Sequence, residues 1–195
     1  MADAALVAFG TRGYERTSLD ALAGDLGIRK QTILYYYASK EALLEAVIDA
    51  AAGELIDALE GALTTAGPGF GRVEEVVRSV FRLAVRRPEL LGLLREVTRL
   101  GPPFATRLRE GLEPFIERAT AFLDAEMARG SVRRQDSRML LLTAYSTVIG
   151  VATEVEVLRA LGLETTARSL VRRRAELIAY LRSALEGEGP TPSRA

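Results

Sequence analysis

Apolar residues recur along this chain at intervals of three and four, the spacing of a helix that buries one face. The pattern begins at Ala5, Leu6 and Phe9 and continues almost to the end of the chain. No stretch shows the strict alternation expected of a half-buried strand. The runs Gly67-Pro68-Gly69 and Gly101-Pro102-Pro103 interrupt the helical pattern. We therefore predict an all-α fold.

Two short helices separated by a glycine are expected in the first quarter of the chain. Leucines at the helical spacing over residues 19–26 predict the first, and Thr17 and Ser18 offer hydroxyls for its N-cap. Gly27 is the expected stop, and the second helix should cover residues 30–37. Helices this short are not stable alone, so they must pack against their neighbours.

The second short helix has an inner and an outer face. Ile33 and Tyr37 lie four residues apart and should point inwards together. The groups left for the outer side suit DNA: Arg and Lys bind phosphate or guanine, Gln reads adenine, and the Thr methyl meets thymine. These residues are Arg29, Lys30, Gln31, Thr32, Tyr35 and Tyr36. No acidic side chain lies between Gly27 and Lys40.

Lys40 has a separate expected role at the start of the next helix. Ser39 is a good N-cap, and a lysine in a first turn is unfavourable for the helix dipole. A bound phosphate would favour both the lysine and the free N–H groups. Lys30 and Lys40 are the only lysines of the chain. A competing interpretation is that the tyrosines only pack against the core and that the basic residues belong to the solvated surface. This alternative remains open for any one of these residues.

The segment resembles the DNA-binding domain of the TetR family of bacterial regulators. The matching positions are Thr17, Ser18, Leu22, Ala23, Gly27, Ile28, Thr32, Tyr35, Tyr37, Ser39, Lys40, Glu41, Ala42 and Leu43. The chain departs from the family at Leu34, where a tyrosine is usual, and at Tyr36, where histidine is common. The resulting set of expected DNA contacts is Thr17, Ser18, Arg29, Lys30, Gln31, Thr32, Tyr35, Tyr36 and Lys40.

Beyond this segment we predict a helical bundle. A long helix over residues 40–63 should link the three-helix DNA-binding domain, residues 1–45, to a ligand-binding and dimerisation domain, residues 46–187. Residues 188–195 form a polar tail that we expect to be disordered.

The last two predicted helices, residues 136–161 and 164–186, have the character of an interface. The first is apolar almost all round, so it should be buried on more than one side. Two such helices from each of two chains would make a four-helix bundle, and the resemblance implies the same homodimer. The alternative is that they complete a monomeric core.

An effector site is implied by the resemblance, in the middle of the second domain. Its expected apolar lining is Phe81, Leu94, Val97, Leu108, Leu112, Phe115, Phe122, Tyr145 and Ile149. Few polar groups accompany them, so a small, mostly hydrophobic molecule is expected. Each residue could equally be ordinary core.

The amino-acid composition narrows the classes of function that the chain could have. The chain lacks cysteine and histidine, so the commonest nucleophile–base pairs and metal ligands are absent. We find no nucleophile elbow, phosphate loop or metal spacing, and predict no cofactor, metal or catalytic residue. No run of about 18 apolar residues occurs, and we expect a cytoplasmic protein. The favoured interpretation is a dimeric repressor released from its DNA operator by an effector. A DNA-binding dimer with a filled core, controlled by a protein partner or by nothing, is the alternative; a helical enzyme is less favoured.

Overall fold

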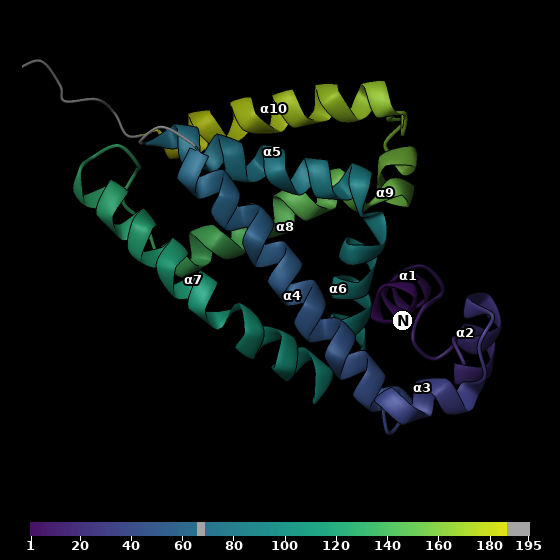
Figure 1. Cartoon of the computed structure of the whole chain (residues 1–195). Helices are drawn as coiled ribbons and strands as arrows, with labels where there is room; N and C mark the ends of the chain where they lie inside the picture. The colour runs from purple at the N-terminus through teal and green to yellow at the C-terminus, as the bar shows by residue number, and fades with distance from the viewer. Residues whose placement is uncertain (66–68, 187–195) are drawn as a thin grey trace, which may run out of the picture. The chain divides into compact units, whose positions relative to one another are not determined.

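The computed structural model describes residues 1–65 and 69–186, and this part of the chain is helical with short connections (Figure 1). The helices are α1 (Ala2–Arg12), α2 (Leu19–Leu26), α3 (Lys30–Tyr36), α4 (Lys40–Thr65), α5 (Phe70–Arg86), α6 (Pro88–Leu100), α7 (Phe104–Ala128), α8 (Ser137–Thr153), α9 (Val155–Ala160) and α10 (Ala167–Leu185). Among these residues the only β-type pairing is an isolated bridge between Val132 and Glu186. The all-α prediction is confirmed.

The helices form two compact units. The first comprises Met1–Asp57 and Leu83–Pro114, and the second comprises Ala58–Arg82 and Phe115–Ala195. This division differs from the predicted boundary after residue 45, because α6 and the first half of α7 belong with the N-terminal helices. The predicted tail, residues 188–195, lies outside the described residues.

The first unit is built around the N-terminal half of α4. Leu43, Leu44, Val47 and Ile48 are each at most 1% exposed. They follow the three-and-four spacing that the sequence shows, so their burial is the expected result of an amphipathic helix. Within the same unit, α1 lies beside α6 (Figure 1).

Two glycines allow α1 and α6 to cross closely. A Cβ on Gly10 would lie 2.1 Å from the carbonyl oxygen of Glu89, and one on Gly92 would lie 2.2 Å from that of Gly10. Helix α1 continues through Gly10 to Arg12. Because Gly10 has no side chain, the backbones of α1 and α6 can approach each other at this point. Gly13, with φ of +89°, follows its end.

In the second unit, α8 packs against α10. Leu140 and Val148 of α8, and Leu177 and Leu181 of α10, are buried. Asp136 caps α8 as predicted, and its carboxylate accepts the N–H of Met139 at 2.8 Å.

The predicted helix over residues 136–161 is not continuous. Glu154 has φ of −82° and ψ of 70°, outside the helical region, and it separates α8 from α9. The sequence here contains β-branched residues such as Ile149, Val151 and Val157, which lose side-chain freedom in a helix.

No helix within residues 1–65 and 69–186 has both the length and the apolar content needed to cross a membrane.

Candidate nucleic-acid interface

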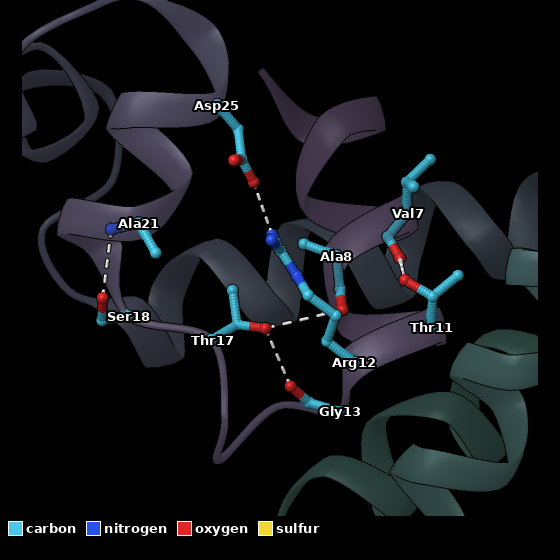
Figure 2. Close-up of polar contacts among 9 residues, drawn as sticks. All are labelled: Val7, Ala8, Thr11, Arg12, Gly13, Thr17, Ser18, Ala21 and Asp25. Carbon is cyan, nitrogen blue, oxygen red and sulfur yellow. Dashed lines mark hydrogen bonds and ion pairs between the residues drawn. The ribbon is translucent and has the colours of Figure 1, made fainter.

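Ser18 and Gly27 define the two ends of α2. The side-chain oxygen of Ser18 accepts a hydrogen bond from the N–H of Ala21 at 3.0 Å (Figure 2). Gly27 follows the helix with φ of +65°, a left-handed conformation that glycine adopts without steric penalty. The predicted N-cap and stop are both confirmed. The Ser18 hydroxyl is used here as an acceptor, so its proton can still be donated to another group.

Thr17 is buried inside the first unit. Its side chain is 1% exposed, and its hydroxyl donates to the carbonyl oxygens of Gly13 at 2.9 Å and Ala8 at 3.5 Å (Figure 2). The expectation of a DNA contact through this side chain is therefore corrected. Thr17 fixes the connection between α1 and α2, because both bonds reach back to the end of α1.

An ion pair joins α1 to α2 at the surface. Arg12 Nη2 lies 2.6 Å from Asp25 Oδ2, and both side chains are about half exposed (Figure 2). Exposed pairs of this kind contribute about 1 kcal/mol or less. The pair orients α2 rather than providing much stability.

The second short helix, α3, buries Ile33 as predicted, whereas Tyr37, which was also expected to point inwards, is half-buried and follows the end of the helix. Ile33 is fully buried, whereas Tyr35 is 83% and Tyr36 is 65% exposed. The rings of the two tyrosines meet edge to face, with centroids 5.1 Å apart. The other predicted contacts on this segment, Arg29, Gln31 and Thr32, are exposed as well. Aromatic side chains as exposed as these are unusual in a domain that binds no partner. Their hydroxyls can donate hydrogen bonds to phosphate oxygens.

Lys30 is held by an acidic side chain from α2. Its Nζ lies 2.9 Å from Asp20 Oδ2 across the turn between the helices. Both side chains are substantially exposed, so the pair is weak and a phosphate can compete with it. Between Gly27 and Lys40 the exposed face has no acidic residue of its own.

The first turn of α4 carries Lys40 next to a buried phenol. The Ser39 hydroxyl accepts the N–H of Ala42 at 3.1 Å, which confirms the predicted N-cap. The Tyr14 hydroxyl donates to Glu41 Oε1 at 3.1 Å. Burial first, and then this bond to a carboxylate, raise the pKa of Tyr14. The backbone N–H of Glu41, then the Ser39 and Tyr14 hydroxyls, hold the pKa of Glu41 below its ordinary value.

Sequence reasoning did not identify the residues that support this face. Tyr14, Glu41 and the α6 residue Glu96 had no assigned role, and neither did the pair of Arg12 and Asp25. An aromatic residue just after the helix-ending Gly13 was the one available signal. Glu96 lies 82 residues beyond Tyr14, and nothing in the local pattern connects them.

The nine residues expected to line an effector site are divided between the two units. Leu94, Val97, Leu108 and Leu112 belong to the first unit, and Phe81, Phe115, Phe122, Tyr145 and Ile149 belong to the second. Phe81, Leu94, Val97 and Leu108 are buried, whereas Tyr145 is 50% exposed. Phe122 is half-buried, with the Arg72 guanidinium 5.0 Å from its ring centroid.

A cavity of about 480 Å³ in the second unit has a different lining. It lies between α5 and α10 and is bordered by Glu74, Arg78, Arg174, Ala175, Ile178, Ala179, Arg182, Ser183 and Glu186. Arg182 crosses it from α10 to reach Glu74 of α5 at 3.0 Å, and it also pairs with Glu186, at the end of its own helix, at 3.0 Å. Its charged border does not match the predicted apolar pocket.

Comparison with known proteins supports the assignment of this face. Residues 2–47 match the family described as "Bacterial regulatory proteins, tetR family". The HTH-type transcriptional regulator BetI of Rhizobium meliloti (strain 1021) is 28% identical over 166 residues, which are 80% of this chain and 82% of BetI. The matched family segment contains all of α1, α2 and α3.

Solved structures share the fold over nearly the whole chain. The transcriptional regulator FadR from Bacillus subtilis, in complex with stearoyl-CoA, aligns with a TM-score of 0.77 at 18% identity, covering 94% of this chain and 96% of FadR. A TetR transcriptional regulator from Chloroflexus aurantiacus J-10-FL also gives 0.77, at 21% identity and 95% and 94% coverage. Residues 2–47 of this chain therefore resemble the helix-turn-helix segment of TetR-type transcriptional regulators, and the whole chain has the fold of these solved structures.

Proposed function

We propose that the protein is a homodimeric transcriptional repressor that leaves its operator when a small, mostly hydrophobic molecule binds. The observation that carries the DNA-binding part is the outer face of α3. This face carries basic side chains, hydroxyl groups and the Gln31 carboxamide, and it has no acidic residue between Gly27 and Lys40. A surface of this kind suits the phosphates and base edges of a major groove.

Within this proposal the DNA-contacting residues have distinct roles. Phosphates are bound by Lys40, Ser18 and the hydroxyls of Tyr35 and Tyr36. These groups offer hydrogen-bond donors or positive charge, but they lack the paired planar donor and acceptor that would read a base edge. Gln31 and Thr32 meet base edges, where a carboxamide can pair with adenine and a methyl can meet thymine. The basic side chains that can bind either phosphate or guanine are Arg29 and Lys30.

Dimerisation is proposed through α8 and α10. Met139, Leu142 and Tyr145, spaced by three along α8, are between 50% and 59% exposed, and Tyr180 of α10 is 61% exposed. Apolar side chains gathered on one helix favour association with a second apolar surface. A twofold dimer would place two copies of α3 about 34–36 Å apart, one turn of DNA.

Repression and its release follow from this arrangement. A dimer bound over a promoter blocks polymerase, and an effector that prefers a dimer with another spacing of the recognition helices would release it. Moving the population from 1:99 to 99:1 requires a preference of about 5.5 kcal/mol. The FadR structure, with stearoyl-CoA bound, supports the proposal that this fold admits a largely apolar effector.

A second candidate is a DNA-binding dimer with a filled core. Phe81, Leu94 and Val97, each expected to line the effector site, are at most 5% exposed. Side chains so well covered can be ordinary core. In that case a protein partner, or nothing, controls DNA binding.

A gel shift with the DNA that flanks the gene tests the function. We expect the protein to retard this DNA in the presence of excess nonspecific competitor. Failure to retard any flanking fragment, with the protein folded, would contradict the proposal. A thermal-shift screen of acyl chains, acyl-CoA esters and other apolar molecules then separates the two candidates, because a filled core predicts no hit that also releases the DNA.

A further inference from the structure

Tyr14, on the connection between α1 and α2, contacts four helices of the first unit: α1, α4, α6 and α7. Its side chain is 6% exposed, and its ring meets those of Phe9 of α1 and Phe104 of α7 at centroid distances of 5.4 and 5.8 Å. Its backbone N–H donates to Glu96 Oε1 of α6 at 2.8 Å. Ring and backbone are thus both held in place, although the residue lies outside any helix.

The free face of this ring supports the ammonium of Lys40. Lys40 Nζ lies 4.0 Å from the ring centroid of Tyr14, well within the range of a cation–π contact. Such a contact holds a cation over the negative face of the ring but does not neutralise its charge. The N–H donors that point away from the ring remain available for a phosphate oxygen.

Glu41 strengthens this support. Its carboxylate accepts the Tyr14 hydroxyl at 3.1 Å, so electron density shifts from the O–H bond towards the phenol ring. A more electron-rich ring attracts the ammonium more strongly, because the attraction is electrostatic. Lys40 and Glu41 are neighbours in the first turn of α4, and both therefore converge on one residue of the preceding connection.

We propose that Tyr14 is a positioning residue for DNA binding, which holds the Lys40 ammonium over its ring and presents it, still charged, to a phosphate at the N-terminus of α4. The inference rests on the proposed role of Lys40 in DNA binding. It adds that the contact depends on a buried aromatic residue outside the helix-turn-helix, and on α6 through Glu96. Tyr14 itself does not touch the DNA.

A double-mutant cycle on DNA affinity tests the coupling. The probe is a fluorescein-labelled, mixed-sequence duplex of about 30 base pairs, long enough for two half-sites one turn apart, titrated at low salt and followed by anisotropy. Tyr14→Leu should weaken binding by about two- to fivefold, the size expected for an exposed cation–π contact. Tyr14→Phe keeps the ring and should retain most of the affinity. In a Lys40→Ala background, Tyr14→Leu should cause no further loss.

The two lysines of the chain allow a direct readout without DNA. In protein labelled with ¹³C-lysine, the ε-methylene signals come from Lys30 and Lys40 alone. We expect the Lys40 signal to be shifted upfield by the ring current of Tyr14, and the Lys30 signal, beside Asp20, to be unshifted. Tyr14→Phe should keep the upfield shift and Tyr14→Leu should remove it. Circular dichroism on each variant shows that the helices remain folded.

The outcomes separate the inference from the function on which it rests. If Lys40→Ala leaves affinity unchanged, the phosphate contact by Lys40 is wrong, and the inference is overturned with it. If Lys40→Ala weakens binding but Tyr14→Leu does not, or weakens it equally in the Lys40→Ala background, Tyr14 does not act through Lys40. If the Tyr14→Leu protein does not fold, the spectra of the wild type and of Tyr14→Phe decide. The proposal fails if neither spectrum contains an upfield-shifted Lys40 signal.

Discussion

The two lysines of the DNA-facing surface carry the same charge but are held by different chemistry. Lys30 pairs with the Asp20 carboxylate at 2.9 Å, so a phosphate must compete with an anion for it. Lys40 lies over the neutral Tyr14 ring. We therefore expect Lys40 to contribute more to sequence-independent attraction, since more of its charge remains available to the DNA.

At this scale the first prediction separates affinity from base preference. Gln31→Ala should cost about 1–3 kcal/mol at one base position and relax preference there, because a carboxamide pairs with adenine through two bonds. Lys40→Ala should weaken binding to every sequence alike and flatten the salt dependence by about one counterion. Anisotropy titrations over a set of single-base operator variants at several salt concentrations measure both. The assignment fails if the two variants exchange these behaviours.

At the scale of the helices, the crossing of α1 and α6 depends on backbone contact at Gly10 and Gly92. A Cβ at either position would lie within 2.2 Å of a carbonyl oxygen, and a backbone cannot yield as a flexible side chain can. We expect Gly92→Ala to destabilise the fold by about 1–3 kcal/mol through overpacking. Urea unfolding followed by circular dichroism measures the change.

Gly53 provides the matched control for this substitution. It lies inside α4 in the same unit, and a Cβ there would meet nothing within 4 Å. Gly53→Ala should therefore stabilise the protein by up to about 1 kcal/mol, the difference in helix propensity. Equal effects of the two substitutions would show that the close crossing has no energetic role.

The link from α6 to Tyr14 should be sensitive to acid. Bonds from the Arg99 guanidinium and then the Tyr14 N–H hold the pKa of Glu96 below its ordinary value of 4.5. The unfolded chain then takes up the proton at a higher pH than the folded chain. The stabilisation is complete above pH 4.5 and is lost as the pH falls through the depressed pKa.

Glu96→Gln tests this dependence. We expect it to lower the free energy of unfolding by about 1–2 kcal/mol at neutral pH, as for loss of a charged hydrogen-bond acceptor. Its difference from wild type should shrink as the pH falls below 4.5 and through the depressed pKa of Glu96, because the wild-type carboxylate then becomes protonated too. Glu110→Gln, an exposed carboxylate on α7, should change stability little at either pH. A constant difference for Glu96→Gln from neutral to acid would contradict the assignment.

The helices of the N-terminal segment could be predicted well, because the signals that define them lie within a few residues along the chain. Ser18 marks the start of α2 through a hydrogen bond to a residue close by, and Gly27 marks its end through its own dihedral angles. Ile33 is buried, as its spacing indicated. The errors involve contacts that are distant in sequence. The close crossing at Gly10 could not be predicted, because its partner, Gly92, belongs to α6. Thr17 looked like a surface hydroxyl, and only the fold shows that the end of α1 covers it.

At the scale of the whole molecule, the apolar stripe of α8 should determine oligomeric state and, through it, operator affinity. Leu142 is 55% exposed between Met139 and Tyr145, so Leu142→Glu would bury a charge in the proposed dimer interface. We expect a monomer by size-exclusion chromatography with light scattering. Because two linked half-sites bind far more tightly than one, operator affinity should fall by about 10²-fold or more. Val85→Glu, the same kind of change at a 60% exposed position on α5, should leave both properties unchanged. A Leu142→Glu protein that remains dimeric would move the interface away from α8, whereas a monomer with full operator affinity would remove the need for a dimer in DNA binding.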